Sequence, residues 1–459
     1  MIEFFTLHFF TIITSLLVAV TIGHLLTQRK KPSSTIAWAV VIIVLPYLGI
    51  LFYIIFHGRK MDKVIKNLKE IKLSKRYEVA EGFDKVEKLL RANGIAGATA
   101  GNDFTLFEDG VQGYEKLVEH LKSAQQSIYI YTYIFGKDAV TQTILDILVQ
   151  KAKEGVEVKL LIDAFGSQSL EFNPHILKAL RHAGGEYHFF MSMLKHPMSS
   201  KLNLRNHRKM IVVDCCFVTT GGINISKSYL SPTQLGLWTD LSFSLKGAAA
   251  LHYKEIFQHN WESDAKTKLQ TYHDKYSISY GEAIVQVVPS GPDVDRDALY
   301  EAFLTLLYKA QKKITIVTPY FAPDSSLMDA LIVAKHRGVE IKIVVPLASD
   351  HYITDVARSA YLRDLQKEGV EIFFYKDKMM HAKVLLIDDS CAVLGSSNFD
   401  VRSFFYNFEV VSFIYSKEDI MIVNKWIEKL FPACKLGIED AGGVRIQFEN
   451  FFKIFAPAL

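Results

Sequence analysis

The sequence predicts an α/β protein with two similar α/β/α repeats, preceded by two transmembrane helices. The first observation is a duplicated motif: residues 206–224 and 380–398 both contain His-x-Lys, four residues, Asp, six residues and Gly-(Gly or Ser)-x-Asn. The second is that similar apolar runs and amphipathic segments precede both copies. The third is a pair of long apolar stretches near the N-terminus. A motif of this length is too specific to recur by chance, which indicates an internal duplication.

The chain of 459 residues is long enough for an anchor and two domains of ordinary size. We expect residues 1–58 to form a membrane anchor and residues 59–105 a basic amphipathic segment with a linker. Residues 106–275 then form the first repeat and residues 276–459 the second. The polar stretch 262–274, after a helical pattern at 251–261, marks the boundary between the repeats.

Residues 4–26 and 35–56 are each apolar enough to span a bilayer. A basic Arg-Lys-Lys follows the first stretch and no basic region precedes it, so a cleaved signal peptide is disfavoured. A buried hairpin in a soluble protein is the remaining alternative. Basic residues near membrane helices prefer the cytoplasmic side, and the larger basic cluster follows the second stretch. We therefore expect a multi-pass protein of the cell membrane whose N-terminus and catalytic domains lie on the cytoplasmic side. Arg29, Lys30 and Lys31 in the connector oppose this topology and leave open a re-entrant or interfacial first segment.

Three further segments are predicted from composition. Residues 59–76 carry lysines between apolar residues, a pattern that on a helix gives a cationic stripe for anionic lipid headgroups or a solvated face. Residues 94–101 are rich in Gly and Ala and predict a loop. Residues 448–455 are aromatic and either touch the membrane or pack against the protein.

The two repeats share an order of strand, helix and strand. In the first repeat these are residues 127–135, 139–153 and 156–162; in the second they are residues 313–321, 326–337 and 339–345. This order indicates βαβ units in a mixed, largely parallel sheet that is covered on both faces. The apolar runs 210–213 and 384–387 add a buried strand to each motif.

The motif residues suit an anionic substrate. Residues two apart on a strand share a face, so His207 lies beside Lys209 and His381 beside Lys383. A lysine can hold a phosphate oxygen while a histidine attacks phosphorus or protonates a leaving oxygen. The same lysines would repel a cation, and we find no metal-ligand spacing, so we expect neither a metal nor another cofactor.

The motif His-Lys-Asp followed by Gly-Ser-x-Asn resembles that of the phospholipase D superfamily, and the chain is most similar to its bacterial cardiolipin synthases. The resemblance extends to residues 395–409, to Trp-Thr-Asp at 238–240, to Ser-Gly-Pro-Asp at 290–293 and to both ends of the chain. It implies that two phospholipase D-like α/β/α repeats form a pseudo-twofold catalytic unit, with one site built from both motifs. The predicted catalytic residues are His207, Lys209, Asp214, His381, Lys383 and Asp388, with Asn224 and Asn398 as phosphate-binding residues.

Within this set the two aspartates of the motifs are expected to be mainly structural, as in the family. The resemblance instead assigns orientation of the histidines to Glu409 and, in the first half, to Asp240; the alternative is that both are surface carboxylates. The four cysteines show no framework spacing and indicate small buried side chains.

The family implies a phosphatidyl transfer in which His207 attacks phosphatidylglycerol and His381 protonates the departing glycerol, after which a second phosphatidylglycerol takes the phosphatidyl group to give cardiolipin. The rivals are a membrane-bound phospholipase D-type hydrolase, a nuclease and a non-catalytic scaffold. The net charge of +4 and the duplicated motif argue against nucleic acid. The sequence does not indicate an oligomeric state.

Overall fold

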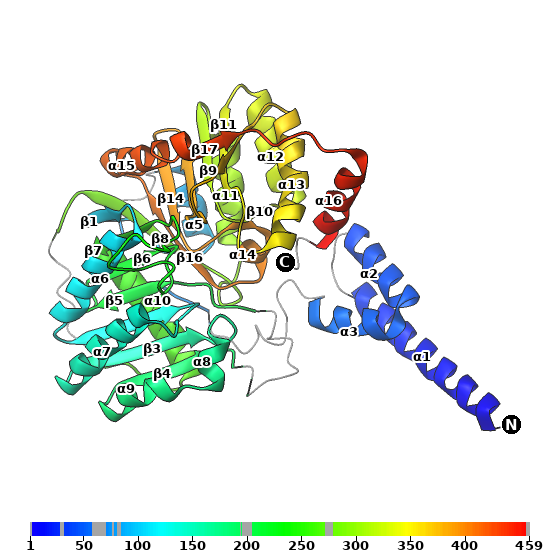
Figure 1. The fold of residues 1–459 in the computed structure, drawn as a ribbon, viewed down its shortest axis with the longest axis horizontal. Coiled ribbons are helices and arrows are strands. Elements are labelled where there is room, and N and C mark those ends of the chain that lie inside the picture. The colour runs from blue at the N-terminus through cyan, green and yellow to red at the C-terminus, as the bar shows by residue number, and fades with distance from the viewer. Residues whose placement is uncertain are drawn as a thin grey trace.

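One sheet of 15 strands runs through the catalytic part of the protein in the computed structural model, in the order β17-β12-β11-β9-β13-β14-β16-β8-β1-β7-β6-β5-β2-β3-β4 (Figure 1). The structure describes residues 2–27, 32–56, 70–75, 78–79, 84–192, 194, 204–270 and 279–455. The strands are β1 Thr99–Phe107, β2 Ser127–Thr132, β3 Glu157–Asp163, β4 Glu186–Phe190, β5 Met210–Val213, β6 Phe217–Gly221, β7 Ser242–Lys246, β8 Ala283–Ser290, β9 Lys313–Val317, β11 Glu340–Pro346, β12 Glu371–Tyr375, β13 Val384–Ile387, β14 Cys391–Gly395, β16 Glu409–Ile414 and β17 Cys434–Leu436. A separate short pair joins β10 Phe321–Ala322 to β15 Phe399–Asp400.

The helices lie on both faces of this sheet and at one side of the molecule. They are α1 Ile2–Thr27, α2 Pro32–Val44, α3 Pro46–Phe56, α5 Lys85–Ala92, α6 Gly110–Ser123, α7 Ala139–Lys153, α8 Gln168–Phe172, α9 Lys178–His182, α10 Ala248–Asp264, α11 Ala298–Lys309, α12 Ser325–His336, α13 Tyr352–Lys367, α14 Val401–Phe405, α15 Lys417–Glu428 and α16 Gly443–Phe455. Asp138 and Asp324 begin α7 and α12 by accepting hydrogen bonds from backbone amides of the first turn.

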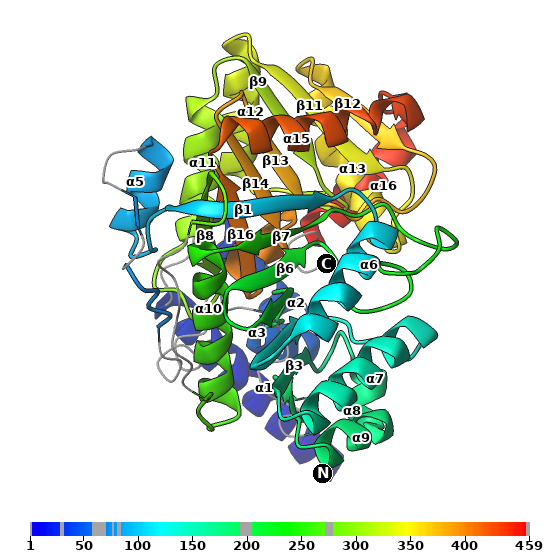
Figure 2. The same cartoon turned by 90° about the vertical axis from the view of Figure 1, so that its left-hand side faces the viewer.

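The two halves repeat the same strand order outward from the antiparallel junction of β8 with β1. On one side follow β7, β6, β5, β2, β3 and β4; on the other follow β16, β14, β13, β9, β11 and β12. Figure 2 shows β1 crossing the molecule at this junction. The predicted duplication is therefore seen as a pseudo-twofold arrangement, and β5 and β13 hold equivalent places in it.

The side chains of β2 show why the sheet is covered twice. Ile128 and Ile130 point to a core shared with α6 and α7, whereas Tyr129 and Tyr131 point to a core shared with α10. Successive strand residues face opposite sides, so an uninterrupted apolar run buries both. The prediction of a largely parallel sheet was wrong. Among the described strands of the large sheet, the parallel pairs are β2–β3, β3–β4, β9–β11 and β11–β12, and the other neighbours are antiparallel. The motif strands turn back in tight hairpins, which produces antiparallel neighbours.

The N-terminal helices differ from the expected pair of long helices. The second apolar stretch is divided into α2 and α3, since Pro46 begins a new helix, and Leu25, Ile42 and Tyr53 are buried where the three helices pack. Within the parts of the chain that the structure describes, no helix meets the combined length and hydropathy that crossing a membrane requires.

Two other expectations are partly tested. Most of the basic segment 59–76 lies outside the described residues, and its described part, residues 70–75, forms neither helix nor strand. The predicted loop 94–101 ends within β1, which starts at Thr99 and joins both halves of the sheet. The predicted helix at 251–261 is confirmed as part of α10.

Candidate active site

The motif histidines lie where the two halves meet, and each motif is bonded to a segment of the other half. The backbone amide of His207 donates to the carbonyl of Phe408 over 2.9 Å, and that of His381 donates to the carbonyl of Thr239 over 2.7 Å. The next residue in each accepting segment is a carboxylate, Glu409 or Asp240. The backbone thus brings each histidine beside an acid from the opposite half.

The histidine side chains complete these crossed pairs. Nδ1 of His207 lies 3.1 Å from both carboxylate oxygens of Glu409, and Nδ1 of His381 lies 2.8 Å from Oδ2 of Asp240. A proton on Nδ1 that is donated to a carboxylate leaves Nε2 with its lone pair for chemistry. The sequence pointed to both acids but did not show that each contacts the histidine of the other half.

Both carboxylates are themselves held by neighbours. Glu409 accepts from the hydroxyl of Ser396 and, over 3.4 Å, from the amide of Asn407. Asp240 accepts from the backbone amide of Leu241 over 2.7 Å. Gly222 occupies the position equivalent to Ser396, and a Cβ there would lie 2.1 Å from Oδ1 of Asp240. Gly222 is therefore required because a larger side chain would collide with Asp240, whereas Ser396 donates a hydrogen bond to Glu409.

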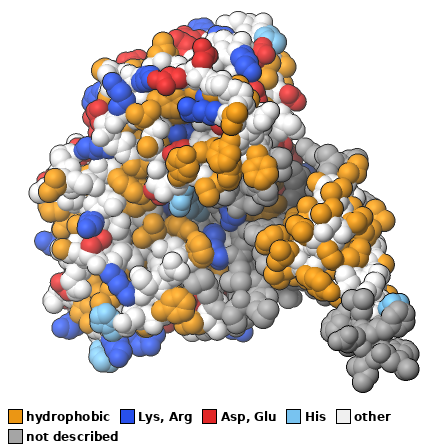
Figure 3. All heavy atoms as spheres, turned by 45° about the vertical axis from the view of Figure 1, so that its right-hand side comes forward, with side chains coloured by type: hydrophobic (Ala, Val, Ile, Leu, Met, Phe, Trp, Pro, Cys, Tyr) orange, Lys and Arg blue, Asp and Glu red, His pale blue; other side chains and the backbone are white. Residues whose placement is uncertain are grey.

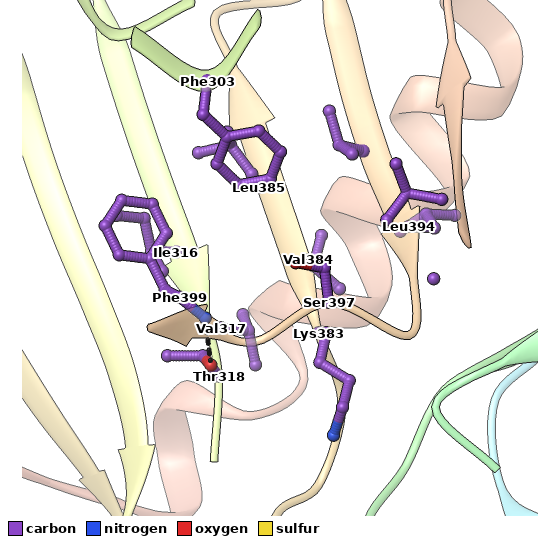
Figure 4. A pocket seen from close by; sticks show the side chains of 13 residues that line it. Phe303, Ile316, Val317, Thr318, Lys383, Val384, Leu385, Leu394, Ser397 and Phe399 are labelled. Carbon is purple, nitrogen blue, oxygen red and sulfur yellow. Dashed lines mark hydrogen bonds between the residues drawn. The ribbon is translucent and has the colours of Figure 1, made fainter. Parts of the chain in front are cut away.

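The motif lysines are buried beside the histidines. Nζ of Lys209 donates to the carbonyl of His207 over 2.9 Å, and Nζ of Lys383 donates to the carbonyl of His381 over 2.6 Å. Nζ of Lys383 also lies 3.0 Å from Nε2 of His381. Figure 4 shows that the Lys383 side chain leads away from the apolar side chains between β9 and β13, with its nitrogen at the far end. Each ammonium group is thus directed toward its own histidine.

Burial disfavours the protonated, positively charged forms of the histidines and lysines in this cluster. Burial, reinforced by neighbouring lysines, lowers the pKa of His207 and brings the pKa of His381 to about 4. Burial likewise lowers the pKa of Lys209 to about 7 and that of Lys383 to about 8. Burial alone would raise the pKa of Glu409, but the charges of His207 and Lys209 and the hydrogen bonds from His207 and Ser396 outweigh it and leave this pKa lowered.

The two motifs share one electrostatic environment. Lys383 contributes to the lowered pKa of His207, and Lys209 contributes to that of His381. The structure therefore brings six of the predicted residues together: His207, Lys209, Asp240, His381, Lys383 and Glu409. An anion placed among them would be attracted to both lysines, and its charge would raise the pKa values of all four basic groups.

The aspartates of the motifs lie at the opposite end of their strands from this cluster. Asp214 accepts hydrogen bonds from the backbone amides of residues 125–127, and Asp388 does the same for residues 311–313. Both have a φ of 49°, which a short polar side chain tolerates at a tight turn. Asp214 and Asp388 fix the motif hairpins to β2 and β9 and do not touch the histidines.

The predicted phosphate-binding asparagines follow the glycine turns and are buried. The Asn224 side-chain oxygen accepts from the backbone amide of Ile134 over 3.2 Å, next to Tyr133. The side-chain oxygen of Asn398 is buried and has no hydrogen-bond partner within the described residues. The structure thus places both amides in the motif turns that follow β6 and β14.

Aromatic rings against the histidines were missed from the sequence. The Tyr133 ring lies 5.2 Å from that of His207, and the Tyr229 and Trp238 rings lie 5.0 and 5.7 Å from that of His381. These rings exclude water from the imidazoles and limit their rotation. Only Trp238, which stands next to the Thr-Asp of the predicted acid, carried a sequence signal.

A second missed feature is a buried ion pair behind the motif. The guanidinium of Arg208 donates to both carboxylate oxygens of Asp293 over 2.6 and 2.7 Å, to Oδ1 of Asn260 over 2.7 Å and to the carbonyl of Glu409 over 3.0 Å. Two parallel hydrogen bonds of this kind fix the orientation of the planar guanidinium relative to the carboxylate. Arg208 therefore ties the first motif to the second half of the chain and to the strand that begins with Glu409.

The fold and this cluster define a class of protein: an α/β enzyme with two phospholipase D-type motifs that share one site. Within the described residues, no three His, Cys, Asp or Glu side chains form a metal-binding group. Comparison with known proteins narrows the class. Residues 117–261 and 303–431 match the family described as "Cardiolipin synthase, PLD-like domain", and residues 16–57 match "Phospholipase_D-nuclease N-terminal".

The chain is also similar to named bacterial enzymes over most of its length. It is 32% identical over 438 residues to the major cardiolipin synthase ClsA of Bacillus subtilis (strain 168), covering 90% of this chain and 89% of that protein. It is 33% identical over 468 residues to a cardiolipin synthase of Oceanobacillus iheyensis, covering 96% and 97%. The fold matches the crystal structure of phosphatidylserine synthase from Haemophilus influenzae Rd KW20 with a TM-score of 0.64 and 16% identity, over 82% of this chain and 100% of that chain.

The chain belongs to the family of cardiolipin synthases with a PLD-like domain. The resemblance predicted from the sequence is confirmed, and the protein is a phosphatidyltransferase of this family.

Proposed function

We propose that the protein makes cardiolipin by transferring a phosphatidyl group from one phosphatidylglycerol to another, with release of glycerol. The observation that carries this proposal is the crossed arrangement of His207 with Glu409 and His381 with Asp240, between two buried lysines. Two imidazoles that face one anionic substrate supply a nucleophile and an acid, which is what replacement at a phosphodiester needs.

In the first step, Nε2 of His207 attacks the phosphorus of phosphatidylglycerol. A bond from nitrogen to phosphorus forms, the bond from phosphorus to the glycerol oxygen breaks, and His381 gives its proton to that oxygen. Glu409 stabilises the imidazolium that develops on His207, because its negatively charged carboxylate accepts a hydrogen bond from Nδ1–H. The pKa of His381 is about 4. The negative charge of the bound phosphate must therefore raise this pKa for His381 to carry the proton that it donates.

In the second step, His381 takes a proton from the primary hydroxyl of a second phosphatidylglycerol. That oxygen attacks phosphorus, the bond to His207 breaks, and cardiolipin leaves. Lys209 and Lys383 stabilise the nonbridging oxygens in both steps, assisted by Asn224 and by Asn398 after its amide turns toward the phosphate. Asp214 and Asp388 act only through the hairpins that they hold.

We also propose that the N-terminal helices form a multi-pass anchor in the cell membrane, with α1 as one transmembrane segment and α2 with α3 as the other. Support comes from their exposed side chains: Ile12, Leu16 and Val20 of α1 are 63–67% exposed, and Ile43 and Val44 of α2 are 60% and 67% exposed. Such a surface is stable in hydrocarbon and costly in water. The basic residues after α3 favour a cytoplasmic catalytic part, which a reporter fused to the C-terminus would test.

Product analysis of the purified full chain with phosphatidylglycerol as the sole lipid tests the reaction. We expect cardiolipin and free glycerol in equal amounts. Phosphatidate in place of cardiolipin would identify a hydrolase, in which water resolves the phosphohistidine. The variants His207→Ala and His381→Ala serve as controls, since both lack one half of the proposed pair and neither should form cardiolipin.

A further inference from the structure

The loops that follow β3 and β11 carry exposed apolar side chains in both halves. Phe165 and Phe172 are 47% and 60% exposed after β3, and Leu347, Tyr352 and Ile353 are 51%, 76% and 47% exposed after β11. These five residues are called the apolar rim. The strands β3 and β11 hold equivalent positions in the two halves, so the rim has one part in each half.

The first part of the rim adjoins His207. The guanidinium of Arg205 stacks on the Phe165 ring at 4.4 Å, and the Arg205 carbonyl accepts the amide of Phe408 over 2.8 Å. Next to Phe165, Gly166 packs so closely that a Cβ would lie 2.3 Å from the carbonyl of Tyr133, whose ring contacts His207. The first loop therefore borders the site itself.

The second part of the rim adjoins His381 through a short chain of contacts. The amide of Leu347 donates to the carbonyl of Tyr375 over 2.8 Å, and the Tyr375 hydroxyl lies 3.2 Å from the hydroxyl of Thr239. Thr239 holds the backbone of His381 and precedes Asp240. The two parts of the rim are thus linked to the same cluster, one through each half of the chain.

Exposed apolar side chains, with charged ones among them, lead from the rim to the C-terminal helix. A groove between α13 and α16 is lined by Leu347, Tyr352 and Phe448 and also by charged residues such as Asp355, Lys435 and Arg445. Val444 and Phe451 on α16 are 85% and 54% exposed. Figure 3 shows hydrophobic side chains gathered on this face of the catalytic part, with the apolar N-terminal helices beside it. Figure 1 shows α16 on the same side of the molecule as α1, α2 and α3.

We propose that the apolar rim and the exposed face of α16 insert into the surface of a phospholipid bilayer and thereby position the active site at that surface. The inference rests on the proposed function, because the reacting phosphate of a membrane lipid lies at that surface. An anchor raises the local concentration of lipid but does not orient the site. Apolar side chains in the segments next to each histidine would let a lipid reach the site without its acyl chains crossing water.

The test compares bilayer substrate with monomeric substrate. The rim variant of the full chain carries Phe172→Ser, Tyr352→Ser and Ile353→Ser, none of which contacts the histidine cluster. The matched control carries Val333→Ser, Met421→Ser and Ile422→Ser, which change side chains that are 43%, 53% and 42% exposed on α12 and α15. Each is assayed with long-chain phosphatidylglycerol in liposomes and with dihexanoyl phosphatidylglycerol below its micelle concentration.

We expect the rim variant to be about tenfold slower on liposomes and within about twofold of wild type on the monomeric lipid, since three apolar contacts with the bilayer are lost. The control variant should match wild type on both. Equal losses on both substrates would overturn the proposal, because the rim would then belong to the site or the fold. Unchanged activity on liposomes would also overturn it and leave the rim to a protein partner. Release of phosphatidate by wild type would refute only the synthase reaction.

Discussion

His207 is held by Glu409, a residue 202 positions away in the other half of the chain, with Nδ1 3.1 Å from both carboxylate oxygens. His381 is held in the same way by Asp240 over 2.8 Å. Neither half therefore contains a complete histidine and carboxylate pair. The duplicated halves have become dependent on each other, and each acid should affect the chemical step of the histidine that it contacts.

A phosphatidyl ester of p-nitrophenol separates the two roles, because this leaving group departs without a proton. We expect His381→Ala to keep a first-turnover burst of nitrophenol within about tenfold of wild type, and His207→Ala to lose the burst by at least about 10⁴-fold. A burst in His207→Ala and none in His381→Ala would reverse the assigned roles.

The crossed pairs predict that each acid follows its partner in the same assay. Glu409→Gln should reduce the burst by about 10²- to 10³-fold, as it weakens the nucleophile, whereas Asp240→Asn should leave the burst nearly intact and slow glycerol release from phosphatidylglycerol. If both variants reduced the burst equally, the acids would act on the site as a whole and not on one histidine each.

The rate should depend on pH through the buried lysines and histidines. Lys209 and Lys383 must be protonated to hold phosphate, and their pKa values are about 7 and about 8. With the p-nitrophenyl ester, whose leaving group needs no proton from His381, we therefore expect kcat/KM to fall as pH rises through this range. His207 must be neutral to attack, and burial lowers its pKa, so the acid limb lies below the usual histidine value of about 6.5. The expected profile is a bell.

The variant Lys209→Arg identifies the group behind the alkaline limb. Arginine keeps its charge above pH 10, so we expect the fall in kcat/KM to begin about one pH unit higher, where Lys383 loses its proton. The maximum should be lower, because the planar guanidinium places its donors differently from an ammonium group. An unchanged limb would assign it to Lys383 or to another group. Lys209→Gln, which has no charge at any pH, is the control for loss of binding.

The sequence predicted those features of the site that neighbouring residues encode, but not those that depend on how the two halves dock. The motif spacing predicted strands that carry His207, Lys209, His381 and Lys383, and the apolar runs that follow do form β5 and β13. The four side chains themselves lie in the segments that lead into these strands. The pairing of His207 with Glu409 spans 202 positions and depends on how the halves dock, which no local pattern encodes. The break in the second apolar stretch did have a local signal, namely Pro46, which begins α3. The prediction of one continuous helix instead followed the high hydropathy of the whole stretch.

The equivalent residues Gly222 and Ser396 should respond in opposite ways to exchange. Gly222→Ser puts a Cβ 2.1 Å from Oδ1 of Asp240, so the acid must leave His381, and we expect cardiolipin synthesis to fall by at least about 10²-fold. Ser396→Gly removes one hydrogen bond to Glu409, whose contacts with His207 and Asn407 remain, and we expect about a threefold to tenfold loss. Equal losses would contradict the asymmetry between the two turns.

The buried pair of Arg208 and Asp293 predicts a loss of stability that is separate from chemistry. Asp293→Ala leaves a fully buried guanidinium whose remaining partners are the neutral Asn260 and backbone carbonyls, so we expect the free energy of unfolding to fall by about 3–5 kcal/mol. Replacing both residues, as Arg208→Met with Asp293→Leu, removes the unpaired charge and should recover most of that loss. Denaturant unfolding of the full chain in detergent measures both. Because Arg208 also bonds the carbonyl of Glu409, the double variant should fold but remain slow, which separates the support of the fold from the alignment of the acid. Recovery of activity together with stability would show that this bond does not align Glu409.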